Sequence, residues 1–170
     1  MRILSVLAFL ILSQVSFGQI FGNSDSFKSR YIKATADLFA GRYPDAKLAL
    51  HQLDSMQPKN ANIAFQLGYC HIQPPVNCKR AIDYLKFAAS NTTREYREGY
   101  YKETKAPLEV YKYLGDAYRL NYDFDIAIQT YEKFREMLEN DAYEQKNAIT
   151  RLINSCHYAK KMKETPISMT

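Results

Sequence analysis

The residues best suited to metal or thiol chemistry are Cys70, His71 and Cys78, the only cluster of such side chains in the sequence. As a zinc site they supply at most three ligands and lack the paired C-x-x-C spacing that makes such motifs strong. Adjacent helical residues also point about 100° apart, so Cys70 and His71 do not easily aim at one ion. The same angle argues against Cys156 and His157 as a catalytic dyad. We therefore predict no metal, cofactor or redox centre.

No other catalytic arrangement is apparent. The sequence lacks a Ser-His-Asp order, a glycine-rich phosphate loop and a pair of carboxylates at a defined spacing. Its formal net charge of +5 comes from 23 basic and 18 acidic residues, which are interspersed along most of the chain. This charge is too mild to indicate nucleic-acid binding. We predict a protein that is not an enzyme and has no nucleic-acid partner.

The N-terminus has the features of a secretory signal peptide. Met1 and Arg2 give a positive start, residues 3–15 are mostly apolar, and Ser16-Phe17-Gly18 is a small-residue cleavage site. The run is shorter than the about 20 apolar residues that cross a bilayer of about 30 Å, and no later stretch approaches that length. We predict a signal peptide at 1–18, a flexible segment at 19–26 and no transmembrane segment in the mature chain. An uncleaved anchor helix is the alternative.

A helix-hairpin signature occupies residues 111–131. Tyr111 and Leu114 fall at i and i+3 on one face of the first helix, and Gly115 and Ala127 are the small residues where two helices would cross closely. In the turn between them, Asp123 is placed to cap the second helix. This pattern resembles the tetratricopeptide repeat, whose hairpins stack into curved helical arrays that hold other proteins.

The same frame fits two earlier segments, which turn at Gly41 and at Pro74-Pro75. A long apolar-faced helix follows the third hairpin and would cover the exposed end of the stack. We predict an all-α tetratricopeptide-repeat α-solenoid of three helix hairpins plus a C-terminal capping helix. The predicted domain spans 27–163, with repeats at 27–60, 61–90 and 108–139, a capping helix at 142–162 and a tail at 164–170.

The segment from Asn91 to Ala106 exceeds the usual connection between two helices. Long loops are often functional, and this one carries several tyrosines and charges. The alternative is that it extends the preceding helix and ends in a linker at Pro107, which would be the first residue of the next helix. The residues leave both interpretations open.

A concave groove in such an array would be lined by first-helix positions that do not pack within the hairpin. Aromatic and arginine side chains at such positions are good anchors for a partner. Glu109 and Asp116 replace two residues of the Lys and Asn clamp that binds chaperone tails, so a carboxylate-tail ligand is not predicted. For each position an ordinary surface residue is the alternative. The predicted partner-binding residues are Asn62, Phe65, Tyr69, Glu109, Lys112, Asp116 and Arg119.

A structural disulfide is a second interpretation of the cysteines. If Gly68 faces Ala81 in an antiparallel hairpin, Cys70 lies nearly opposite Cys78, and export favours oxidation. Cys156 would then be a buried, inert thiol on the apolar face of the last helix.

Three segments carry a more specific resemblance: residues 36–43 (ADLFAGRY), 66–70 (QLGYC) and 105–118 (KAPLEVYKYLGDAY). Together they resemble the N-terminal repeat region of large periplasmic OmpA-family proteins, in which a WD40-like β-propeller and a peptidoglycan-binding domain follow. One member of that family belongs to the type IX secretion machinery. The sequence ends at Thr170, about where the propeller would start, and no residue that could bind peptidoglycan in that manner is present.

The resemblance implies an exported, periplasmic interaction scaffold. Its expected partner is an envelope protein or peptide, with peripheral association to an outer-membrane or secretion complex. The alternatives are a truncated N-terminal module of a larger peptidoglycan-associated protein, and an enzyme that uses Cys70, His71 and Cys78.

Overall fold

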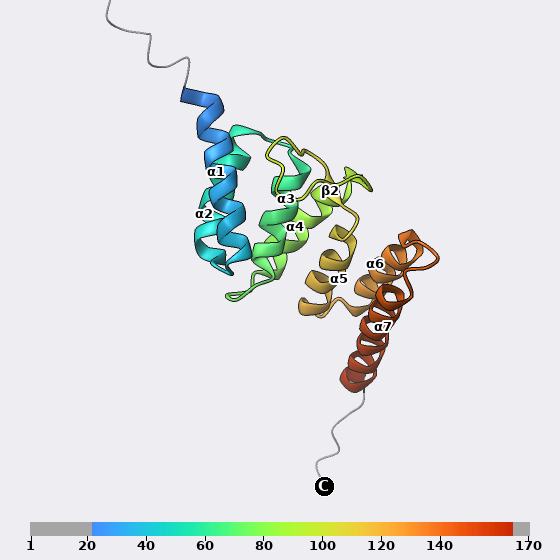
Figure 1. Cartoon of the computed structure of the whole chain (residues 1–170). Coiled ribbons are helices and arrows are strands. Elements are labelled where there is room, and N and C mark those ends of the chain that lie inside the picture. The colour runs from blue at the N-terminus through green and yellow to red at the C-terminus, as the bar shows by residue number, and fades with distance from the viewer. Residues whose placement is uncertain (1–21, 165–170) are drawn as a thin grey trace, which may run out of the picture.

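The computed structural model describes residues 22–164, and this part of the chain is almost entirely helical (Figure 1). The predicted all-α class is therefore confirmed. The predicted signal peptide at 1–18, residues 19–21 and the tail from 165 lie outside the described residues. No helix in the described part is long and apolar enough to cross a membrane. The elements are α1 (Gly22–Phe39), α2 (Tyr43–Met56), α3 (Ala61–His71), α4 (Cys78–Ala89), β1 (Thr92–Thr93), β2 (Ala106–Pro107), α5 (Val110–Leu120), α6 (Phe124–Met137) and α7 (Tyr143–Glu164).

Each helix packs mainly against its neighbours in the sequence, so the helices lie side by side from α1 to α7 (Figure 1). α1 begins at Gly22, within the segment predicted to be flexible. The chain turns at Gly41 after α1, as the sequence predicts, and Gly41 adopts a φ of 70° that a glycine tolerates without strain. The turns between α1 and α2, between α3 and α4, and between α5 and α6 place the two helices of each pair antiparallel (Figure 1).

Side-chain caps fix where α3 and α4 begin. The Asn60 side chain accepts hydrogen bonds from the backbone N–H groups of Asn62 and Ile63, and Asn77 accepts one from Arg80. The predicted cap on α6 is only partly right. Asp123 occupies the position before the helix, but no hydrogen bond from its side chain caps α6, and its Oδ2 instead accepts one from the Asn121 amide at 2.7 Å.

The buried apolar side chains form two clusters that meet on α3. Ile63, Leu67 and Cys70 pack with residues of α1 and α2, whereas Ala61 and Ala64 belong to a cluster that reaches from α4 to α7. Nine of the 11 residues of α3 are buried. α3 is therefore the central element of the molecule.

Two glycines allow the closest helix crossings, but their partners differ from the predicted ones. A Cβ on Gly68 would collide with Leu85 of α4, and one on Gly115 would collide with Tyr131 of α6. The sequence predicts Ala81 and Ala127 at these crossings. In both hairpins the close approach lies about one helical turn further along the second helix.

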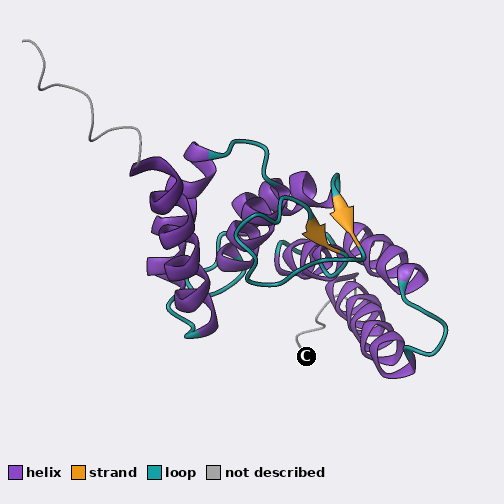
Figure 2. Cartoon of the chain, turned by 45° about the horizontal axis from the view of Figure 1, so that its top comes forward, coloured by secondary structure: helices purple, strands orange, loops and turns teal. Residues whose placement is uncertain are grey.

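The connection between α4 and α5 is an ordered loop rather than an extension of α4. Its two ends are joined by β1 and β2, which pair in parallel (Figure 2), and the Ala106 N–H donates to the Asn91 carbonyl at 2.9 Å. Pro107 belongs to β2, and α5 begins at Val110. The prediction that Pro107 starts the helix, one of the two alternatives, is therefore wrong. We call residues 91–106 the α4–α5 loop.

Candidate functional site

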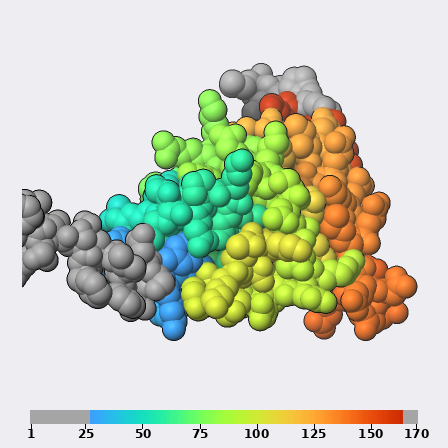
Figure 3. All heavy atoms as spheres, turned by 90° about the horizontal axis from the view of Figure 1, so that it is seen from above, coloured from blue at the N-terminus to red at the C-terminus, as the bar shows by residue number. Residues whose placement is uncertain are grey.

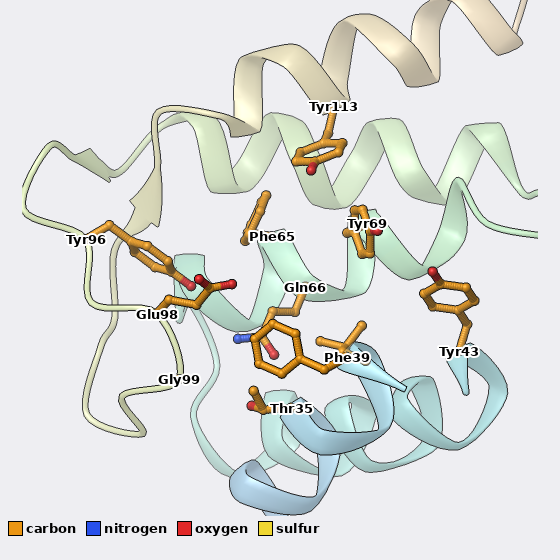
Figure 4. Close-up of a pocket in the computed structure, with 11 residues that line it drawn as sticks. Thr35, Phe39, Tyr43, Phe65, Gln66, Tyr69, Tyr96, Glu98, Gly99 and Tyr113 are labelled. Carbon is orange, nitrogen blue, oxygen red and sulfur yellow. The ribbon is translucent and has the colours of Figure 1, made fainter. Parts of the chain in front are cut away.

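A cavity of about 300 Å³ opens on the face shared by α1, α3 and α5 and is bounded on one side by the α4–α5 loop (Figure 4). Its volume lies at the lower end of the range for ligand pockets. We call it the aromatic pocket. It is lined by Thr35, Leu38, Phe39, Tyr43, Phe65, Gln66, Tyr69, Tyr96, Glu98, Gly99 and Tyr113.

Five of the lining rings form one continuous series of contacts. The centroids of Tyr43 and Tyr69 are 6.1 Å apart, and those of Tyr69 and Tyr113 are 5.0 Å apart. Phe65 continues the series, 5.8 Å from Tyr113 and 6.4 Å from Tyr96. Such spacings are those of edge-to-face and offset aromatic pairs. Each ring is therefore held in place by contacts with its neighbours, and the cavity lies between the rings.

Helical spacing explains how the pocket is assembled. Phe65 and Tyr69 are four residues apart on α3, so they lie on the same face, and Tyr113 reaches them from α5. Phe39 comes from the last turn of α1 and is 71% exposed, although it is a large apolar side chain. The Phe39 ring therefore adds exposed apolar surface at the mouth of the cavity.

The α4–α5 loop is held in place through Asn62. The Asn62 Oδ1 accepts a hydrogen bond from the Tyr96 hydroxyl at 2.8 Å, and its Nδ2 donates to the Tyr31 hydroxyl at 2.9 Å. The carbonyl of Thr104 accepts from the Ala61 N–H at 2.9 Å, which ties the loop to the first turn of α3. Asn62 is completely buried, so the prediction that it contacts a partner is wrong. It positions the pocket wall instead.

Contacts within the loop and to α1 define its path. The Glu103 Oε1 accepts from the backbone N–H groups of Thr104 and Lys105, at 3.0 Å each. The Lys28 ammonium lies 5.5 Å from the ring centroid of Tyr101, which joins the loop to α1. In Figure 3 the yellow-green loop residues lie between the blue residues of α1 and the orange residues that precede α7.

Two buried polar atoms of the pocket lining lack a hydrogen-bond partner in the described part of the chain. Gln66 Oε1 and Thr35 Oγ1 are buried and have no hydrogen-bond partner among residues 22–164. The Glu98 carboxylate projects beside the Tyr96 hydroxyl (Figure 4). Burial, with smaller contributions from Tyr31 and then Glu98, raises the pKa of Tyr96 well above its usual value, so its hydroxyl stays protonated.

The predicted residues on α5 form a separate charged row. The Lys112 Nζ lies 2.9 Å from Asp116 Oδ2, and the Arg119 guanidinium lies 3.8 Å from Asp116 Oδ1. The Tyr131 hydroxyl donates to Asp116 Oδ1 at 2.7 Å. Asp116 is therefore tied into the α5–α6 hairpin. Glu109 lies apart from both groups, beside Phe134 and Leu138 near the end of α6.

Phe65 and Tyr69 are the predicted residues that line the aromatic pocket. Repeat spacing missed Tyr113, although it stands two residues before Gly115 as Gln66 stands two before Gly68. That correspondence relates the two positions to each other, but neither belongs to the positions that the groove prediction selected. The residues from α1 and the loop carry no such periodic signal. The pocket residues absent from the prediction are Thr35, Leu38, Phe39, Tyr43, Gln66, Tyr96, Glu98, Gly99 and Tyr113.

Two side chains of the predicted cysteine and histidine cluster, Cys70 and His71, are held in uncharged forms. Burial raises the pKa of the Cys70 thiol to about 12. Burial, followed by the charges of Lys47, His51 and Arg80, lowers the pKa of His71 to about 4. At neutral pH a protonated thiol is a poor nucleophile and a poor metal ligand.

Cys70, Cys78 and Cys156 are free thiols in the structure. The crossing of Gly68 at Leu85 removes the geometric argument that placed Cys70 opposite Cys78. The disulfide stays a prediction.

A scan of known protein-family models finds no match to the sequence. A search of curated proteins finds none either. The resemblance to tetratricopeptide repeats and to OmpA-family proteins therefore stays a prediction, and the function must be argued from the pocket.

Proposed function

We propose that this protein is a non-catalytic binding scaffold of the tetratricopeptide-repeat type that holds an extended peptide segment of another protein in its aromatic pocket. The observation that carries the proposal is the series of ring contacts from Tyr43 to Tyr96 around an open cavity. Tyrosine-rich concave sites supply large contact areas at low entropic cost, and such residues dominate the binding energy of protein interfaces.

The order of the helices supports the repeat assignment. Three consecutive helix pairs, α1–α2, α3–α4 and α5–α6, are followed by α7, which packs against α6. Gly68 and Gly115 lie at equivalent close crossings of the second and third pairs. In repeat arrays of this kind the first helices of successive pairs line one face, which is where α1, α3 and α5 form the pocket.

The proposed location follows from the sequence. The signal-peptide pattern at 1–18 and the OmpA-family resemblance favour the periplasm and an envelope protein as partner. We place the protein at the periphery of an outer-membrane or secretion complex.

Peptide selection tests the proposed function directly. The protein purified from cells that express the full-length sequence would be immobilised and used to select peptides from a random decapeptide display library. Selected peptides would then be labelled and titrated against the wild type, Tyr69→Ala and Tyr113→Ala by fluorescence anisotropy. Loss of either ring should weaken binding about tenfold or more.

Tyr122→Ala is the matched control, because Tyr122 is 71% exposed and does not line the pocket. Circular dichroism and urea denaturation would show that each variant is folded. Recovery of no peptide, or equal affinity of the pocket variants and the control, would contradict the proposal.

A further inference from the structure

The aromatic pocket lacks the basic side chains that are frequent in the rest of the chain. The sequence carries 23 basic residues and a net charge of +5, yet no lysine or arginine lines the pocket. Its one ionisable carboxylate is Glu98. The Glu98 side chain makes no ion pair or hydrogen bond within the described part of the chain.

Several tyrosines elsewhere in this protein already hold a cation on their rings. The Arg97 guanidinium lies 4.2 Å from the centroid of Tyr100, and the Lys133 ammonium lies 4.5 Å from that of Tyr111. Tyr113, at the edge of the pocket, has the Lys112 ammonium 4.4 Å from its centroid. Among residues 22–164 no side-chain cation lies within this reach of the other pocket rings.

The pocket also contains a buried acceptor atom that has no hydrogen-bond donor in the described part of the chain. Gln66 is buried, and its Oε1 accepts no hydrogen bond from any described residue. Glu98 adds an acceptor with a full negative charge next to the Tyr96 hydroxyl (Figure 4). A buried acceptor that lacks a donor costs free energy, and a ligand that supplies the donor recovers it.

We propose that the group bound in the aromatic pocket is the guanidinium of an arginine in a basic peptide segment, stacked on the tyrosine rings with Glu98 as its counter-charge. This inference rests on the function proposed above and specifies its ligand. A guanidinium is planar, weakly hydrated and rich in donors, so it suits an aromatic wall with a carboxylate at its edge. No lysine or arginine is among the lining residues, and Tyr113 is the pocket ring that has a described cation, Lys112, over its face.

Other ligand classes fit less well. An anionic group would face Glu98 and find no lysine or arginine in the pocket lining to pair with. A phenylalanine side chain would fill the cavity but would leave the buried Gln66 Oε1 without a donor.

Peptide pools with one fixed residue test the inference. Labelled octapeptide pools with arginine fixed at the centre would be compared with pools that carry citrulline there, since citrulline keeps the shape and removes the charge. The arginine pool should bind the wild type about tenfold more tightly. In Glu98→Gln this preference should shrink to less than about twofold.

Glu95→Gln is the matched control, because Glu95 is an exposed carboxylate of the same loop that does not line the pocket. It should keep the full preference for arginine. Equal binding of the two pools, or an arginine preference that survives in Glu98→Gln, would overturn the inference and leave the proposed function standing. Binding of neither pool would overturn both.

Discussion

At the scale of single residues, Tyr31 supports the aromatic pocket without lining it. Its hydroxyl accepts hydrogen bonds from Asn62 Nδ2 at 2.9 Å and from Gln66 Nε2 at 3.0 Å, and the side chain is 1% exposed. The Asn62 Oδ1 in turn accepts a hydrogen bond from the Tyr96 hydroxyl. One hydroxyl on α1 therefore fixes two side chains of α3 and, through Asn62, the loop wall.

Removing this hydroxyl by Tyr31→Phe should lower the free energy of unfolding by about 2 kcal/mol, because two buried donors would lose an acceptor. Urea denaturation at neutral pH measures the change. Tyr122→Phe, the same substitution at an exposed tyrosine, is the control and should change stability by less than about 0.5 kcal/mol. If both variants were equally stable, the network around Tyr31 would contribute little.

At the scale of elements, His71 lies uncharged in the seam where α2, α3 and α4 pack together. The His71 ring stacks on Tyr84 of α4 with centroids 5.8 Å apart and planes 4° apart, and its centroid lies 6.1 Å from that of His51 of α2. Both ring nitrogens of His71 are buried without a partner in the described structure. Protonation would place a charge in this seam near Lys47 and Arg80.

This arrangement predicts a loss of stability in mild acid. His71 titrates at 6.5 when unperturbed, but burial lowers its pKa to about 4 in the folded protein. Between these values the unfolded chain binds a proton that the folded protein does not. The contribution of His71 to the free energy of unfolding is therefore fully present above pH 6.5 and falls by about 3 kcal/mol as the pH drops toward 4.

Urea denaturation at several pH values would show this slope in the wild type and a shallower one in His71→Phe. His157→Phe, the same substitution at an exposed histidine, is the control. An unchanged slope in His71→Phe would mean that other groups cause the acid sensitivity. His51, whose pKa burial also lowers, would then be the next residue to replace.

The helices could be predicted from the sequence because their signals are local. Apolar spacing and turn residues such as Gly41 mark them without knowledge of any distant contact. The pocket could be predicted only where it follows that spacing, at Phe65 and Tyr69. Tyr96 and Glu98 reach it through a loop whose path depends on the non-local bond to Asn62, and no periodic pattern reports such a bond.

Register between helices was the other feature that the sequence did not determine. Small residues at Ala81 and Ala127 suggested the crossing points, but Leu85 and Tyr131 occupy them. A glycine opposite a large side chain packs as well as two small residues do, because the combined volume decides the fit.

At the scale of the whole molecule, α3 links the two apolar clusters. Leu67 belongs to the cluster with α1 and α2, and Ala64, three residues earlier, belongs to the cluster that extends to α7. A substitution that removes packing contacts of α3 should therefore destabilise both clusters.

Leu67→Ala should lower the free energy of unfolding by about 3 kcal/mol and should reduce hydrogen-exchange protection in both α2 and α6. Mass spectrometry of deuterated peptides measures protection in each helix. Leu48→Ala is the control, since Leu48 is 66% exposed on α2. Loss of protection confined to α1 and α2 would show that the two clusters open independently.

The pairing of β1 with β2 has a consequence for how this protein can diversify. Because the loop is closed at its base, the chain between Thr93 and Ala106 leaves and returns at nearly one point. Its tip can be lengthened, shortened or exchanged without moving α4 relative to α5, since the closure does not depend on the tip. The residues of the tip and the helical framework can therefore change separately over evolution.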